Sequence, residues 1–192
     1  MNEPRIVGGQ DEWTGGTEEE REVINNLFAA FVETVRKSGG NNATRSLIIT
    51  GHAAAIDEKA VKGIKVPDDD HIIVSIHAYA PYSFALDQSG TSTFSDSDKS
   101  ELDKNFDFLK STFIDKGIPV IIGEFGSLNK DNMSDRVKHM EYYVSAAKAR
   151  GITCFIWDNG VKDGEGAFGL HNRKDGSWYF KDIVDAAMNG LE

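Results

Sequence analysis

Two glutamates occupy positions from which a carboxylate can take part in a reaction. Glu124 lies in the stretch PVIIGEFGS, residues 119–127, directly after a run of β-branched residues. Such a run without polar alternation is typical of a strand buried on both faces, so Glu124 is expected at the carboxyl end of a parallel strand. Glu3 precedes Pro4, which favours extended backbone at Glu3. A pair of carboxyl groups about 5 Å apart can cleave a glycosidic bond with retention, because one protonates the leaving oxygen while the other attacks the anomeric carbon.

Other polar and aromatic side chains follow the ends of predicted strands. In chain order, the strand exits carry Glu3, His52, His77 with Tyr79, Glu124 and Trp157. In barrels of alternating strands and helices the catalytic residues come from the carboxyl ends of several strands, so these side chains are candidates for one site. Each also has a structural alternative: a salt bridge under a loop for Glu124, a solvated terminus for Glu3, and the core and its rim for His77 and Tyr79. The role of His52 stays open.

The segments that would position these residues alternate between strands and helices. Strands are predicted over residues 46–50, 71–77, 119–124 and 152–157, and helices over residues 17–39, 58–62, 98–116, 134–150 and 179–188. On the first helix, the residues that fall on one apolar face are Val23, Leu27, Ala30, Phe31 and Val35. The last strand is expected to be buried. This alternation indicates a parallel α/β sheet with right-handed crossovers.

The composition narrows the classes of partner. The 192 residues carry a net charge of −10, from 31 acidic and 21 basic residues, which disfavours nucleic acid and anionic lipid and is compatible with a neutral substrate. No apolar stretch approaches the ~20 residues of a membrane span, and no signal peptide opens the chain. The single cysteine, Cys154, is interpreted as a small buried hydrophobe. Neither Asp68–Asp70 nor the histidines show the spacing of metal ligands, so neither a metal nor a cofactor is predicted.

Four short motifs together resemble a known family. Asn2-Glu3-Pro4, His77-Ala78-Tyr79, Gly123-Glu124-Phe125-Gly126 and Trp157-Asp158-Asn159 are similar, in order and spacing, to the motifs that end the fourth, sixth, seventh and eighth strands of glycoside hydrolase family 5, the cellulase family. The endoglucanase members resemble the chain most closely. The resemblance implies a (β/α)8 TIM barrel, of which residues 1–192 would form one unit: the C-terminal half, with strands five to eight and the end of strand four.

The resemblance also implies roles for the two glutamates and their neighbours. Glu3 would be the acid/base and Glu124 the nucleophile of a retaining endo-β-1,4-glucanase that acts on cellulose, mixed-linkage glucan or xyloglucan. Tyr79 would donate a hydrogen bond to Glu124, and His77 would orient the pair. The parent enzyme would be secreted.

Three further residues would contact the sugar chain. Asn2 would hydrogen-bond the 2-hydroxyl group, an interaction that strengthens in the transition state. Trp157 would form a floor against which a sugar ring stacks. Trp13 is a candidate for a second platform on the leaving-group side.

A half barrel raises the question of what completes it. An open sheet of four strands would expose two edges and part of the barrel interior. The chain is therefore expected to be part of a larger protein, to pair with a separate N-terminal half-barrel chain, or to pair with a second copy of itself. The alternative function is a noncatalytic half-barrel scaffold, which would bind carbohydrate without turnover.

Overall fold

The sheet has four strands in chain order. In the computed structural model, which describes residues 1–192, the order across the sheet is β1-β2-β3-β4. The strands are β1 (Leu47–Ile49), β2 (Ile72–His77), β3 (Val120–Phe125) and β4 (Thr153–Ile156). β1 and β2 are parallel, with Leu47 opposite Ile72. The predicted α/β fold with a parallel sheet is confirmed.

Helices connect the strands, as parallel pairing requires. They are α1 (Glu18–Lys37), α2 (Glu58–Lys62), α3 (Tyr82–Ala85), α4 (Asp96–Thr112), α5 (Met133–Lys148) and α6 (Lys181–Asn189), with short 3-10 turns at Gly40–Ala43, His52–Ala54 and Ile114–Lys116. The long loop after β2 contains α3, a single helical turn that the sequence analysis did not predict. None of these helices combines the length and the apolar character needed to cross a bilayer.

The chain divides into two compact units, which are described separately. The first unit comprises Met1–His77 and Ser111–Ile121, and the second comprises Ala78–Lys110 and Ile122–Glu192. Glu3 therefore belongs to the first unit and Glu124 to the second. That residues 1–192 form one C-terminal half-barrel unit stays a prediction.

In the first unit, α1 starts at a capping box and buries one apolar stripe. The Glu20 amide donates to Thr17 Oγ1 at 3.2 Å, and the Thr17 amide donates to the Glu20 carboxylate at 2.6 Å. The buried residues of α1 include Ile24, Phe28 and Val32. The predicted apolar face was wrong, because Val23, Leu27 and Phe31 are exposed. The helix carries two neighbouring apolar stripes, and their spacing does not tell which one is covered.

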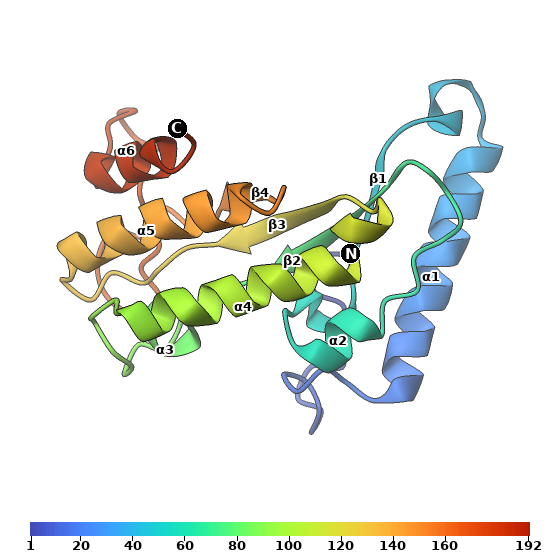
Figure 1. The fold of residues 1–192 in the computed structure, drawn as a ribbon, viewed down its shortest axis with the longest axis horizontal. Helices are drawn as coiled ribbons and strands as arrows, with labels where there is room; N and C mark the ends of the chain where they lie inside the picture. Colours follow the sequence, from blue (N-terminus) through green and yellow to red (C-terminus); the bar gives the residue numbers. More distant parts are fainter. The chain divides into compact units, whose positions relative to one another are not determined.

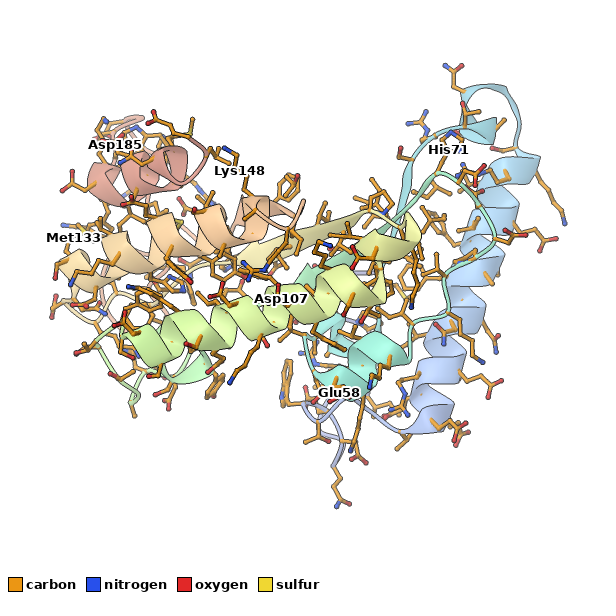
Figure 2. All side chains as sticks on the ribbon, viewed as in Figure 1. Glu58, His71, Asp107, Met133, Lys148 and Asp185 are labelled. Atoms are coloured by element: carbon orange, nitrogen blue, oxygen red, sulfur yellow. The ribbon has the colours of Figure 1, made fainter.

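In the second unit, the core forms around α5. The ring of Tyr143 stacks on Phe125 of β3 with 4.3 Å between centroids and meets Phe106 of α4 edge to face at 5.0 Å. Helix α6 packs alongside α5 (Figure 1). Figure 2 labels Met133 in the first turn of α5 and Lys148 in its last. The buried face of α5 is therefore fixed between β3, α4 and α6.

The predicted burial of the last strand was wrong. In β4, Phe155 is 52% exposed and Ile156 is 37% exposed. The reason is that β4 is an edge strand with no neighbour beyond it in the sheet order. A groove of about 450 Å³ lies beside it, lined by apolar residues of β4, α5 and α6 that include Ile156, Val144 and Met188. Cys154 is partly buried, and burial raises the pKa of its thiol to about 12.

Candidate active site

Glu3 lies in an irregular segment that two contacts hold against the first unit. The backbone oxygen of Pro4 accepts a hydrogen bond from the Ala53 amide at 2.9 Å. The Oε1 atom of Glu3 lies 2.8 Å from Nδ1 of His77, the last residue of β2. The Glu3 side chain is 23% exposed and that of His77 is 9% exposed. The structure thus pairs a carboxylate with an imidazole at the exit of a strand, as predicted for His77.

Arg5 organises the loop that follows Glu3. Its Nη1 atom donates to the Glu3 backbone oxygen at 2.9 Å and to Glu3 Oε2 at 3.3 Å, while its Nε atom donates to Glu12 at 2.8 Å. The hydrogen bond from Arg5 and a second one from the Gly8 amide hold the pKa of the Glu12 carboxyl below its ordinary value. The Arg5 guanidinium also lies 4.3 Å from the ring centroid of Trp13. Trp13 is 62% exposed.

His52 belongs to the support of this loop. Its side chain is buried, and Nε2 lies 3.0 Å from the backbone oxygen of Glu12. Gly16 has a φ of +68°, and a Cβ atom at this position would come within 2.4 Å of His52 Nδ1. Only a glycine therefore allows the loop to lie against the imidazole. In the first unit His52 thus contacts the loop that follows Glu3.

Glu124 lies in the second unit and is the penultimate residue of β3. The Tyr79 hydroxyl donates to Glu124 Oε2 at 2.8 Å, which is the hydrogen bond that the sequence analysis expected. The backbone oxygen of Glu124 accepts from the Ala78 amide at 2.9 Å, so the residue before Tyr79 is held to β3. The Tyr79 ring packs edge to face against Phe168 at 5.4 Å. Glu124 is thus bonded to the Tyr79 side chain and to the backbone of the preceding residue, Ala78.

The loop after β4 begins with the motif Trp157-Asp158-Asn159. The Trp157 amide donates to the Phe125 backbone oxygen at 2.8 Å, and its side chain is 41% exposed. Asp158 Oδ2 accepts hydrogen bonds from the amides of Leu170 and His171 at 3.2 and 2.9 Å. Asp158 therefore closes the loop, and Trp157 is anchored by its backbone at the end of β3 with part of its ring free.

The predicted residues fall into two groups that the structure describes separately. The first unit brings Glu3 to His77, and the second brings Tyr79 to Glu124. Asn2 is exposed next to Glu3 in the chain. A carboxylate with an imidazole and a carboxylate with a phenol are groups that can hold and transfer protons or attack an electrophilic carbon.

Sequence reasoning missed several residues that support these groups. Arg5 and Glu12 hold the Glu3 loop, and Phe168 packs on Tyr79. Arg136 of α5 donates to the backbone oxygen of Ser127 at 3.0 Å, and burial lowers the pKa of its guanidinium to about 10. A buried arginine on a helix could have been noticed as a polar residue between the apolar positions of α5. Nothing in the sequence pairs Phe168 with Tyr79.

The structure has a parallel α/β sheet, a carboxylate bonded to an imidazole in the first unit and a carboxylate bonded to a phenol in the second. In the comparison with protein families, the model of Cellulase (glycosyl hydrolase family 5) matches residues 1–163. The chain belongs to this family of glycoside hydrolases.

Individual relatives are similar over almost the whole chain. Endoglucanase 1 of Ruminococcus albus is 51% identical over 96% of this chain and 46% of its own length. A broad specificity endoglucanase from Ruminococcus champanellensis, solved with bound cellotriose, superposes with a TM-score of 0.94 at 45% identity, over 98% of this chain and 56% of that chain. A xyloglucan-specific endo-β-1,4-glucanase from a metagenomic library, also with cellotriose, gives a TM-score of 0.93 at 43% identity, over 98% of this chain and 56% of that chain. The chain thus spans about half the length of the relatives it matches.

Proposed function

We propose that this chain carries the two catalytic carboxylates of a retaining endo-β-1,4-glucanase, with Glu3 as acid/base and Glu124 as nucleophile. The observation that carries the proposal is that each glutamate is hydrogen-bonded to a residue from the exit of β2, Glu3 to His77 and Glu124 to Tyr79. A retaining mechanism needs two carboxyl groups with different tasks. Their different partners, an imidazole and a phenol, support that division.

The two steps use the same pair of residues in turn. In the first, a carboxylate oxygen of Glu124 attacks the anomeric carbon while the carboxyl group of Glu3 protonates the departing glycosidic oxygen. In the second, Glu3 takes a proton from water as that water attacks the glycosyl-enzyme ester, and Glu124 leaves as a carboxylate. The Tyr79 hydroxyl orients the attacking oxygen, and His77 is placed to exchange protons with Glu3 between the steps.

The reaction requires the two carboxyl groups to stand about 5 Å apart. Support for this comes from the covalent chain. His77 and Tyr79 are separated by one residue, and Cα atoms two positions apart are at most about 7 Å from each other. The chain therefore limits how far the partner of Glu3 can be from the partner of Glu124.

The proposed substrates are β-1,4-linked glucans: cellulose, mixed-linkage glucan and xyloglucan. The support is that the similar solved structures include a broad specificity endoglucanase and a xyloglucan-specific one. Trp157 and Trp13 expose ring faces suited to stacking on sugars, and Asn2 is proposed to bind the 2-hydroxyl group. The parent protein is proposed to be secreted, because polymeric glucans are met outside the cell.

The chain is further proposed to be the C-terminal half of the catalytic barrel, which a preceding segment or an N-terminal half-barrel chain completes. It spans about half of its relatives, and β4 leaves Phe155 and Ile156 exposed at the sheet edge. The same observations favour the second candidate function, a noncatalytic half-barrel scaffold. In that case carbohydrate would bind without turnover until the missing half is supplied, or until a second copy takes its place.

The test is hydrolysis of carboxymethyl-cellulose and xyloglucan, followed by reducing ends and by viscosity, with the solution mass measured on the same sample. It is run with the chain alone and with the chain plus the segment that precedes the matched region in Ruminococcus albus endoglucanase 1. Glu124→Gln is expected to abolish turnover and keep binding, whereas Glu141→Gln, an exposed glutamate on α5, should change neither. Turnover that survives in Glu124→Gln would refute the proposed nucleophile. Sugar binding without turnover in either arm would favour the scaffold.

A further inference from the structure

Two buried polar side chains of α5 hold the backbone on either side of Tyr79. The Tyr143 hydroxyl donates to the backbone oxygen of Ala78 at 2.7 Å, and Nε2 of His139 lies 2.9 Å from the backbone oxygen of Ala80. Both side chains are fully buried. Since the carbonyl oxygen can only accept, Nε2 of His139 carries the proton in this contact. Tyr79 is thus the residue between two carbonyl groups that the same helix holds.

The two contacts are close together both on α5 and on the segment that carries Tyr79. Tyr143 and His139 are four residues apart on α5, which corresponds to an axial distance of about 6 Å. Ala78 and Ala80 are two residues apart, so their Cα atoms are at most about 7 Å from each other. About one turn of helix is therefore enough to reach the carbonyl groups on both sides of Tyr79.

Tyr143 also contacts the other side of the pair. Its ring stacks on Phe125 with an interplanar angle of 16°, and Phe125 directly follows Glu124. A single side chain therefore touches the residue before Tyr79 and the residue after Glu124. His139 is enclosed by the rings of Phe84 and Phe94, with centroids 5.0 and 5.2 Å away. Both contacts with the Tyr79 segment are rigid, since their side chains have no room to change rotamer.

We propose that Tyr143 and His139 are positioning residues that aim the Tyr79 hydroxyl at Glu124. Apolar residues would fill these two buried positions without needing hydrogen-bond partners, whereas a buried polar group costs free energy unless it has one. Here both side chains direct their donors to the two peptide groups that set the backbone of Tyr79. The inference rests on the proposed role of Glu124 as nucleophile for its effect on catalysis, but the geometric part is independent of that role.

The first test is Tyr143→Phe, which keeps the ring on Phe125 and removes only the hydroxyl. We expect kcat on carboxymethyl-cellulose to fall about tenfold with KM within about twofold, as for loss of an interaction that matters in the transition state. In a Tyr79→Phe background the same change should cost no further activity, because its effect passes through the Tyr79 hydroxyl. Additive losses in the double variant would overturn the proposal.

Tyr142→Phe is the matched control on the same helix. The Tyr142 hydroxyl donates to Asp103 of α4 at 2.7 Å, and not to the backbone on either side of Tyr79. Removing the hydroxyl group in Tyr142→Phe should leave kcat unchanged. His139→Gln, which keeps a donor for the Ala80 carbonyl, should retain most activity, whereas His139→Leu should lose it. Equal losses in Gln and Leu would show that His139 acts only through packing.

A crystal structure of Tyr143→Phe separates this inference from the proposed function. We expect the distance from Tyr79 Oη to Glu124 Oε2 to increase from 2.8 Å to beyond hydrogen-bonding range. An unchanged distance with only a lower melting temperature would reduce Tyr143 to a core residue and refute the proposal. If the wild-type protein shows no turnover in any form, the proposed function fails, while this distance still decides whether Tyr143 positions Tyr79.

Discussion

At the scale of single residues, the hydrogen-bond partners distinguish the two glutamates. Glu3 contacts an imidazole and a guanidinium, whereas Glu124 accepts a hydrogen bond from a phenol. Arg5 lies closer to Glu12, at 2.8 Å, than to the Glu3 carboxylate, at 3.3 Å. The main role of Arg5 is therefore to hold the loop from Glu3 to Trp13 in one conformation. That loop has no helix or strand of its own, so side-chain contacts must replace backbone pairing.

The buried imidazole of His139 makes stability depend on pH. Burial lowers the pKa of His139 to about 4, whereas an unfolded histidine has a pKa of about 6.5. Below pH 6.5 the unfolded chain takes up a proton that the folded chain does not, so the free energy of unfolding falls as the pH drops from about 6.5 to about 4. The neutral imidazole contributes at most about 3 kcal/mol to the free energy of unfolding. This contribution is fully present above about pH 6.5 and is lost as the pH falls to about 4.

Urea unfolding between pH 4 and 8 checks this dependence. Between pH 6.5 and 4, the free energy of unfolding should fall less in His139→Gln than in the wild type, because glutamine does not titrate. His71→Gln serves as the control, since the side chain of His71 is 45% exposed. A pH dependence that is identical in wild type and His139→Gln would contradict the assignment of a buried neutral imidazole.

At the scale of elements, α1 shows how local sequence fixes a helix start. Both hydrogen bonds of the capping box at Thr17 are present. Thr17→Ala should therefore lower the free energy of unfolding by about 1 kcal/mol. Thr34→Ala, at an exposed position in the last turn of the same helix, should not lower the free energy of unfolding, because alanine is the better helix former. Thermal unfolding followed by circular dichroism measures both, and equal effects would argue against the cap.

Most elements could be predicted from the sequence because their signals are local. Capping residues, glycine stops and β-branched runs placed α1, α5, β2 and β3 within a few residues. The buried side of α1 could not be predicted, since Val23 and Ile24 begin two equally apolar stripes and tertiary contacts choose between them. The exposure of β4 depends on its place at the sheet edge, which the composition of the strand does not encode.

Some residues of the candidate site could also be predicted from the sequence, and others could not. Glu3, His77, Tyr79 and Glu124 were identified at predicted strand ends, and the family resemblance implied the hydrogen bond from Tyr79 to Glu124, whereas the direct contact between Glu3 and His77 was not predicted. The roles of Tyr143 and His139 could not be predicted, because each binds a backbone oxygen about 60 residues away, and a carbonyl group has no sequence signature.

At the scale of the whole molecule, each unit presents an uncovered apolar surface. In the first unit it is the stripe Val23, Leu27 and Phe31 of α1, and in the second it is Phe155 and Ile156 of β4 with the adjacent groove. Exposed apolar surfaces of this kind mark protein contacts. Together with coverage of about half of the relatives, they support the proposal that further chain completes the fold before it turns over substrate.

The central claim is that Glu124 forms a covalent bond to the sugar, and trapping that bond tests it most directly. The protein, alone or completed by the preceding segment of its relative, is incubated with an activated 2-deoxy-2-fluoro-β-cellobioside, then digested and analysed by mass spectrometry. We predict that the cellobiosyl adduct is on the peptide that contains Glu124 and that Glu124→Gln forms none. An adduct on another residue, or continued hydrolysis without any adduct, would contradict the account.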